Sequence, residues 1–310
     1  MKSRALIAIS LAALCLGIGI TQPRSSSAQP SGQQPAPQAG RKAPPSGRAG
    51  FMQMKVDPRV QMRSYLFKET GEKMEYALFI SSKVRKEEKA PLIVTLHGLG
   101  AGPTIMFGAK ALELAEEGGY ILVGPMGYNV RGWYGISMKG FGPKPKPEGA
   151  DGAASKPKPS MFSNPDDPEN LNELSEKDVM YVLDLVRGEF NVDERRIYLM
   201  GHSMGGAGTL HLGVKYPSIW AALAPIAAAA FTIDPDSMRA IPETPILFIH
   251  GDADEVVPVA NTQRWVAKAR ELGLKHEYLE MPGVSHGPII EGALPAVYAF
   301  FAKHSKPAAH

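Results

Sequence analysis

Residues 196–206 read Arg-Ile-Tyr-Leu-Met-Gly-His-Ser-Met-Gly-Gly, an apolar run that leads into a Gly-x-Ser-x-Gly motif. The apolar run predicts a buried strand, and residues 204–216 after it have the pattern of a helix. A serine raised at a sharp turn between strand and helix needs neighbours without side chains, which Gly201 and Gly205 supply. The stretch therefore predicts a nucleophilic Ser203 at the carboxyl end of a strand.

Short apolar runs alternate with longer helical patterns on both sides of this motif. Strands with apolar residues on both faces, as in buried parallel sheets, are expected at residues 91–96, 120–123, 196–200, 221–226, 245–249 and 277–281. Before them, residues 63–67 and 76–80 flank a turn that contains Gly71 and predict an antiparallel hairpin. This order of elements predicts an α/β protein with a mostly parallel central sheet and helices on both faces.

Two helix starts are indicated by particular residues. Ser175 and Asp178 have the spacing of a capping box, which predicts that a helix begins there. Pro295 fits the first turn of a helix better than its interior, so the last helix is expected to begin near it. Other helices are expected at residues 105–117 and 260–272.

Residues 1–28 have the composition of a secretory signal peptide. Lys2 and Arg4 precede an apolar stretch at residues 5–20, and small residues come before an expected cleavage after Ala28. The product is therefore expected to be secreted or periplasmic. An uncleaved membrane anchor remains the alternative for the same apolar stretch.

The charge and cysteine content exclude several classes of partner. The formal net charge of +3 is accounted for by Lys2, Arg4 and Arg24, which all precede the expected cleavage site. A near-neutral mature chain has no basic footprint for nucleic acid and no general attraction to anionic membranes. Because Cys15 is the sole cysteine, the exported product would have no disulfide and no cysteine-bound metal.

The rest of the chain divides by composition. Residues 29–55 are rich in Pro, Gly and Gln and predict a flexible leader, while residues 56–304 predict one catalytic domain and residues 305–310 a tail. Within the domain, residues 140–170 contain repeated Lys-Pro pairs and glycines and predict an exposed loop. This loop has too few apolar residues to form a core of its own.

An acid and a histidine follow later strands, as catalysis by a serine hydroxyl requires. The strand at residues 245–249 runs into His-Gly-Asp-Ala-Asp, where Asp254 is the preferred acid and Asp252 the alternative. The strand at residues 277–281 is followed by His286. Parallel strands bring such loops to one edge of a sheet, so these side chains are expected to meet Ser203.

On these motifs the chain resembles the α/β-hydrolases over residues 66–303. It is most similar to secreted esterases of the polyhydroxybutyrate-depolymerase and feruloyl-esterase type and to prolyl-oligopeptidase-like serine peptidases. The resemblance depends on four features. They are His-Gly-Leu-Gly at residues 97–100, the Gly-x-Ser-x-Gly turn at Ser203, the string His-Gly-x-x-Asp-x-x-Val-Pro that ends at Pro258, and His286. It implies the α/β-hydrolase fold, with Asp254 as the acid of that string.

The resemblance also implies an oxyanion hole formed by the backbone N–H groups of Leu99 and Met204. Residues 126–135 follow a strand end, where ligand contacts gather in such sheets. Trp133 and Tyr134 in this segment are therefore candidates for the substrate pocket, and a loop that only packs is the equal alternative.

The expected function is that of an exported serine hydrolase that cleaves small or polymeric carboxylic esters through an acyl-enzyme. No cofactor and no metal are expected, because no histidine has metal-ligand spacing, and His97 and His250 are expected to brace loops. The protein is expected to be a monomer or small homo-oligomer, with no nucleic-acid or membrane partner after signal cleavage. A prolyl-oligopeptidase-like peptidase and a non-catalytic hydrolase-fold binding protein are the alternatives.

Overall fold

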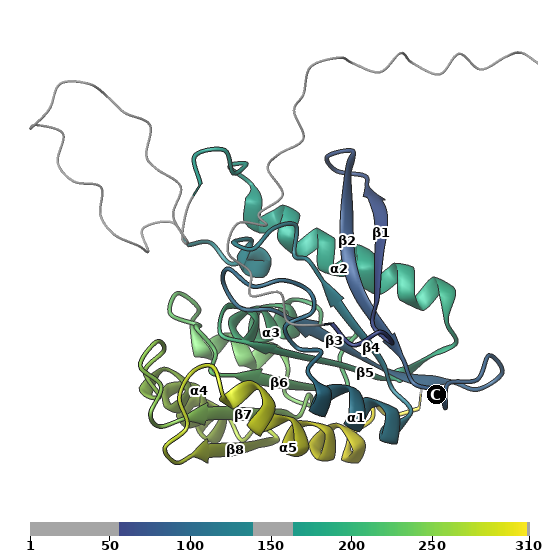
Figure 1. The fold of residues 1–310 in the computed structure, drawn as a ribbon. Coiled ribbons are helices and arrows are strands. Elements are labelled where there is room, and N and C mark those ends of the chain that lie inside the picture. The colour runs from purple at the N-terminus through teal and green to yellow at the C-terminus, as the bar shows by residue number, and fades with distance from the viewer. Residues whose placement is uncertain (1–55, 139–163, 309–310) are drawn as a thin grey trace, which may run out of the picture. The chain divides into compact units, whose positions relative to one another are not determined.

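A sheet of eight strands organises residues 56–138 and 164–308, the part of the chain that the computed structural model describes (Figure 1). The strands lie in the order β1-β2-β4-β3-β5-β6-β7-β8. Their bounds are β1 Gln61–Phe67, β2 Glu72–Ile80, β3 Ala90–Leu96, β4 Ile121–Pro125, β5 Val192–His202, β6 Ala222–Ile226, β7 Ile246–Gly251 and β8 His276–Met281.

Strand directions confirm the predicted hairpin and the mostly parallel sheet. β2 pairs antiparallel with β1 and with β4, whereas every other neighbouring pair is parallel. The turn between β1 and β2 ends at Gly71, whose φ of 71° suits a residue without a side chain. Parallel strands from β4 to β8 have their carboxyl ends at one edge of the sheet, which is where functional loops gather.

Helices cover both faces of the sheet, as predicted (Figure 1). α2, α3 and α4 share one apolar core with the sheet, and α1 and α5 share the other. The bounds are α1 Ala109–Gly118, α2 Leu171–Glu189, α3 Met204–Lys215, α4 Ala260–Glu271 and α5 Ile289–Lys303, with 3₁₀ turns η1 Trp133–Gly135 and η2 Pro235–Ala240.

Side-chain alternation along the strands divides the apolar residues between these two cores. Leu92 and Val94 of β3 belong to the core under α2 and α3, while Ile93 belongs to the core under α1 and α5. β5 divides in the same way, with Leu199 on the first side and Tyr198 on the second. The central strands are therefore apolar at successive positions because both of their faces are buried.

Both predicted helix starts are wrong. α2 begins at Leu171, so Ser175 and Asp178 lie inside the helix, where their side chains hold a neighbouring loop instead of capping. Pro295 lies inside α5, which begins at Ile289. The buried apolar residues before the proline favour the helix enough to offset the one hydrogen bond that its missing N–H removes.

Several predictions made from composition lie outside the described residues: the signal peptide and leader at residues 1–55, and residues 140–163 of the expected loop. A bilayer-spanning helix, with the length and apolar content that this requires, is not found in the described ranges.

The packing of α5 provides a test of the core under α1 and α5. Phe301 has no exposed surface, and its ring stacks on that of Tyr198 at 4.6 Å between centroids. Phe301→Ala is expected to lower the free energy of unfolding by about 3–5 kcal/mol, measured by urea denaturation. Leu66→Ala, at a side chain that is 64% exposed, is the control and is expected to change it by less than about 0.5 kcal/mol. Equal losses in both variants would contradict the assignment of Phe301 to the core.

Candidate active site

Three loops at the carboxyl edge of the sheet carry the residues expected to do chemistry. Ser203 follows β5 directly, and Asp254 and His286 lie in the loops after β7 and β8. These strands are parallel neighbours through β6, so their loops leave the same edge of the sheet. Segments distant in sequence thus reach one place in the fold.

Ser203 lies in a strained turn between β5 and α3. Its φ of 59° and ψ of −116° are a conformation that costs a non-glycine residue on the order of 1–3 kcal/mol. Hydrogen bonds fix both sides of the turn, from Ser203 N to the carbonyl of Ile226 at 3.0 Å and from Ala207 N to the carbonyl of Ser203 at 3.0 Å. Strain held by its surroundings is typical of a functional position.

The two glycines of the motif are required by close backbone approach. A Cβ at Gly201 would lie 2.3 Å from the carbonyl oxygen of Gly205, and a Cβ at Gly205 would lie 2.1 Å from that of Leu96. The first of these atoms belongs to α3 and the second to β3, so neither can move away without shifting its element. The structure therefore confirms that this turn needs glycine on both sides of the serine.

Asp254 and His286 form a hydrogen-bonded pair in which the carboxylate is buried. His286 Nδ1 lies 2.6 Å from Asp254 Oδ2, and the carboxylate has no exposed surface. Asp254 Oδ1 accepts from the N–H groups of Val256 and Val257, each at 2.8 Å. Burial raises the pKa of Asp254, but the hydrogen bonds from His286 and these two N–H groups outweigh it and leave the pKa below its usual value. The carboxylate is thus held ionised, with the imidazole oriented by its Nδ1–H.

Asp252, the alternative acid, binds a backbone N–H group. Asp252 Oδ1 accepts from the N–H of Gly283 at 2.6 Å, in the loop after β8, and no hydrogen bond within the described chain joins it to His286. The geometry therefore pairs His286 with Asp254.

His202 links the serine turn to the histidine loop. Its Nε2 donates to the carbonyl oxygen of His286 at 2.8 Å, and the two rings lie 4.4 Å apart between centroids. Burial and the neighbouring His286 lower the pKa of His202 to about 3, so its ring is neutral at ordinary pH. No hydrogen bond in the described residues joins the side chains of Ser203 and His286. The structure brings Asp254 to His286, and His286 to the residue beside Ser203.

The loop at residues 97–100 packs against the serine turn. A Cβ at Gly98 would lie 3.4 Å from that of Ser203. The N–H groups of Leu99 and Met204, the expected oxyanion donors, make no hydrogen bond to any other part of the described chain. Both His97 ring nitrogens lie close to carbonyl oxygens, those of Gly98 at 2.8 Å and Met126 at 2.7 Å. His97 braces this loop, as predicted.

Tyr134 contacts this loop, and Trp133 precedes Tyr134 in the chain. Tyr134 has no exposed surface, and its hydroxyl donates to the carbonyl oxygen of His97 at 3.0 Å. Trp133 is 8% exposed and belongs to the core under α2 and α3. The observed contacts of both are packing contacts, and their role in a substrate pocket stays a prediction.

Asp178 is a residue whose role the sequence interpretation missed. Its buried carboxylate accepts from Gly127 N at 2.6 Å and from the Tyr65 hydroxyl, and so ties α2 to β1 and to the loop that carries Tyr134. The signal available in the sequence was an acidic residue beside the apolar positions Val179 and Val182 on one helix. Its spacing from Ser175 indicated a helix start, and a helix start does not predict a buried contact with a distant loop.

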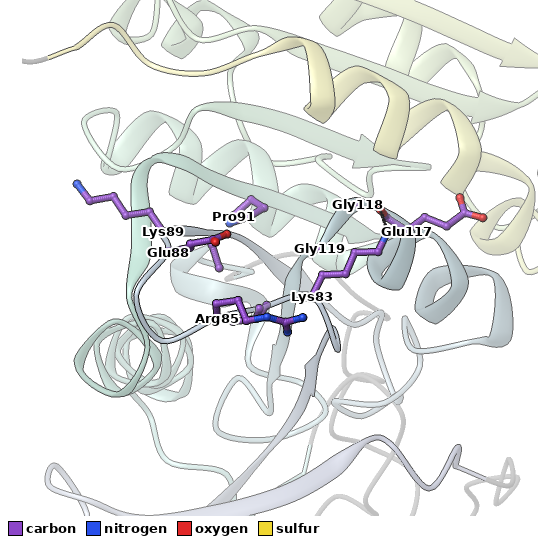
Figure 2. A pocket seen from close by; sticks show the side chains of 10 residues that line it. Lys83, Arg85, Glu88, Lys89, Pro91, Glu117, Gly118 and Gly119 are labelled. Carbon is purple, nitrogen blue, oxygen red and sulfur yellow. Dashed lines mark hydrogen bonds between the residues drawn. The ribbon is translucent and has the colours of Figure 1, made fainter.

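A surface cavity of about 230 Å³ lies elsewhere (Figure 2). Lys83, Arg85 and Lys89 line it, together with Glu88 and Glu117, near the first residue of β3 and the end of α1. None of the candidate active-site residues contributes to it. Within residues 56–138 and 164–308, no group of three or more His, Cys, Asp or Glu side chains is placed to hold a metal ion.

The serine turn gives a test in which two glycines are compared. Gly205→Ala is expected to lower the free energy of unfolding by about 2 kcal/mol or more, because its Cβ would meet the backbone of Leu96. Gly188→Ala in α2, where a Cβ meets nothing within 4 Å, is expected to raise it by about 0.5–1 kcal/mol. Urea denaturation of both measures the difference, and a tolerated Gly205→Ala would refute the close approach.

Asp178 generates a prediction about pH. Burial raises its pKa to about 6 despite hydrogen bonds from Tyr65 and two backbone N–H groups, so the folded state binds the proton more tightly than an unfolded aspartate with a pKa of about 3.9. The stability that this binding adds is full below about pH 4 and is lost as the pH rises through about 6. The stability difference between wild type and Asp178→Asn is therefore expected to fall by about 2 kcal/mol from pH 4 to 7.5.

Chemical denaturation across this pH range measures that difference. Asp184→Asn on the same helix, at a side chain that is 72% exposed, is the control and is expected to show no such fall. A difference for Asp178→Asn that stays constant with pH would contradict the assignment.

Comparisons with known proteins find similarity to esterases. Residues 165–305 match a family model described as Phospholipase/Carboxylesterase. Cutinase 2 of Thermobifida cellulosilytica is 34% identical over 95 residues, 31% of this chain and 34% of the relative. Feruloyl esterase B of Neurospora crassa is 24% identical over 161 residues, 51% of this chain and 45% of the relative. The alignments thus span about a third to a half of these curated relatives.

Solved structures extend the likeness to most of the domain. A thermostable esterase aligns with a TM-score of 0.59 at 24% identity, over 81% of this chain and 64% of that chain. A ferulic acid esterase of Anaeromyces mucronatus aligns with a TM-score of 0.58 at 19% identity, over 84% and 96%. With its strand order, its strained serine turn and its likeness to these structures, the chain has the α/β-hydrolase fold, and its residues 165–305 are similar to the Phospholipase/Carboxylesterase family.

Proposed function

We propose that the protein is an exported serine hydrolase that cleaves carboxylic esters through an acyl-enzyme. The observation that carries this proposal is the Asp254–His286 pair at 2.6 Å, in which His286 belongs to a loop that contacts the turn of Ser203. Relatives named cutinase and feruloyl esterase support ester hydrolysis as the activity. The signal-like composition of residues 1–28 supports export to the periplasm or the medium.

The chemistry begins with attack of Ser203 on the ester carbonyl. His286 Nε2 takes the hydroxyl proton as the oxygen–carbon bond forms, while Asp254 stabilises the resulting imidazolium through Nδ1–H. Collapse of the tetrahedral intermediate breaks the bond to the alcohol, which receives the proton from His286. Water then attacks the acyl-enzyme in the same way and releases the acid, so that both proton transfers balance.

The backbone N–H groups of Leu99 and Met204 complete the proposed site. Charge develops on the carbonyl oxygen in each tetrahedral intermediate, and donors already aimed at it stabilise that charge without reorganisation. The bracing of the 97–100 loop by His97 and Tyr134 keeps one donor in place, and the start of α3 presents the other. In the absence of substrate, both donors are left available by the contacts of the described chain.

A small or polymeric ester is the proposed substrate, and Trp133 and Tyr134 are proposed to shape its pocket. The prolyl-oligopeptidase-like activity is the competing enzymatic assignment, because the same triad can cleave an amide. Comparing hydrolysis of short p-nitrophenyl esters with that of peptide p-nitroanilides separates the two.

The triad is tested by single substitutions. Ser203→Ala, His286→Ala and Asp254→Asn are each expected to lower kcat for p-nitrophenyl butyrate by roughly 10³-fold or more, because each removes a group that acts in the same proton transfer. Asp252→Asn is the control and is expected to keep kcat within about threefold, because its carboxylate binds Gly283 instead of His286. A large loss of kcat in Asp252→Asn with little loss in Asp254→Asn would show that Asp252, and not Asp254, is the acid of the triad.

A further inference from the structure

His250 is a fully buried imidazole at the end of β7 that the proposed reaction does not use. Its Nδ1 lies 2.7 Å from Thr262 Oγ1, in the first turn of α4. Its Nε2 lies 2.9 Å from the carbonyl oxygen of Val257 and 3.2 Å from Asp254 Oδ2. Every polar atom of the ring thus has a partner, and one of those partners is the candidate catalytic acid.

These contacts fix the position of the ring proton. A carbonyl oxygen only accepts, so His250 Nε2 must carry the hydrogen that it shares with Val257 O. In the neutral ring Nδ1 is then an acceptor, and the hydroxyl of Thr262 donates to it. Thr262, which is 2% exposed, therefore selects the tautomer of His250 that presents N–H toward Asp254.

The same ring stabilises both the loop and the carboxylate of Asp254. The N–H of Val257 donates to Asp254 Oδ1, while its carbonyl accepts from His250. Asp254 Oδ2 lies between two imidazoles, that of His286 at 2.6 Å and that of His250 at 3.2 Å. Rotation of the carboxylate would separate it from several donors at once, so its direction toward His286 is fixed.

We propose that Thr262 and His250 are a positioning pair for Asp254, an inference that rests on the proposed ester hydrolysis. The order of contacts is Thr262 to His250, His250 to Asp254 and Asp254 to His286, which anchors the catalytic acid to the first turn of α4. In this series of contacts no proton is transferred beyond His286. The effect of the series is to fix the imidazole of His286, the proposed base, where a displacement of about 1 Å can cost on the order of 100-fold in rate.

The test compares three threonine variants on p-nitrophenyl butyrate. Thr262→Val keeps the shape but removes the donated proton, and is expected to lower kcat by about 10- to 100-fold with KM changed less than about twofold. Thr262→Ser restores the hydroxyl and is expected to recover kcat to within about threefold of wild type. Thr244→Val, at another buried threonine before the amino end of β7, is the control and is expected to keep wild-type kcat.

His250→Gln separates positioning from proton transfer. The glutamine amide can donate to Val257 O and accept from Thr262 but cannot titrate, so it is expected to keep at least about a tenth of wild-type kcat, whereas His250→Leu is expected to lose at least about 100-fold. Activity in His250→Gln as low as in His250→Leu would overturn a purely positioning role. If Thr262→Val does not fold, the difference in kcat between these two histidine variants tests the positioning role.

The remaining outcomes distinguish this inference from the function that it rests on. Wild-type kcat in folded Thr262→Val, or a change confined to KM, would refute the positioning pair and leave the triad intact. A wild-type protein that hydrolyses no ester would refute the proposed function. In that case the low-field proton NMR signal of the His286–Asp254 hydrogen bond still tests the pair, since it is expected in wild type and Thr262→Ser and is expected to shift or broaden in Thr262→Val.

Discussion

The hydrogen bond between His286 and the buried carboxylate of Asp254 is the interaction on which the proposed chemistry of this fold depends. An ionised carboxylate without exposed surface is stable only where donors surround it, and two backbone N–H groups and two imidazoles do so here. Those donors come from the end of β7 and from the loops after β7 and β8. The parallel sheet is therefore what makes the site possible, because it brings both loops to one edge.

A second constraint acts at the turn of Ser203. The strained backbone of this residue persists because β5, β6 and α3 fix its neighbours by hydrogen bonds, and because glycines permit close approach to β3. The same close approach brings the 97–100 loop against the serine. Glycine placement and the position of the proposed oxyanion donors are thus linked to one tight contact between the end of β3 and the turn from β5 into α3.

The fold could be predicted from the sequence to a large extent because its signals are local. Apolar runs such as residues 196–200 and the flanking glycines of Ser203 report burial and turn geometry directly. The starts of α2 and α5 could not be predicted, because there tertiary contacts outweigh the local signal: Asp178 binds a loop, and buried residues carry α5 past Pro295. In the site, the meeting of the loops after β7 and β8 followed from strand order, and the choice of Asp254 over Asp252 followed from the resemblance to α/β-hydrolases. The contacts of His250 and Thr262 depend on side-chain packing that no spacing records.

Labelling with a fluorophosphonate probe, followed by peptide mapping, tests most directly whether these loops form a working nucleophile. We expect covalent modification of wild-type protein at Ser203, and a labelling rate lower by several orders of magnitude when His286 is replaced by alanine. A hydrolase fold used only for binding would not react. Failure of folded wild-type protein to react would therefore contradict the assignment of Ser203 as a nucleophile activated by His286. So would reaction at another residue, or a rate that does not depend on His286.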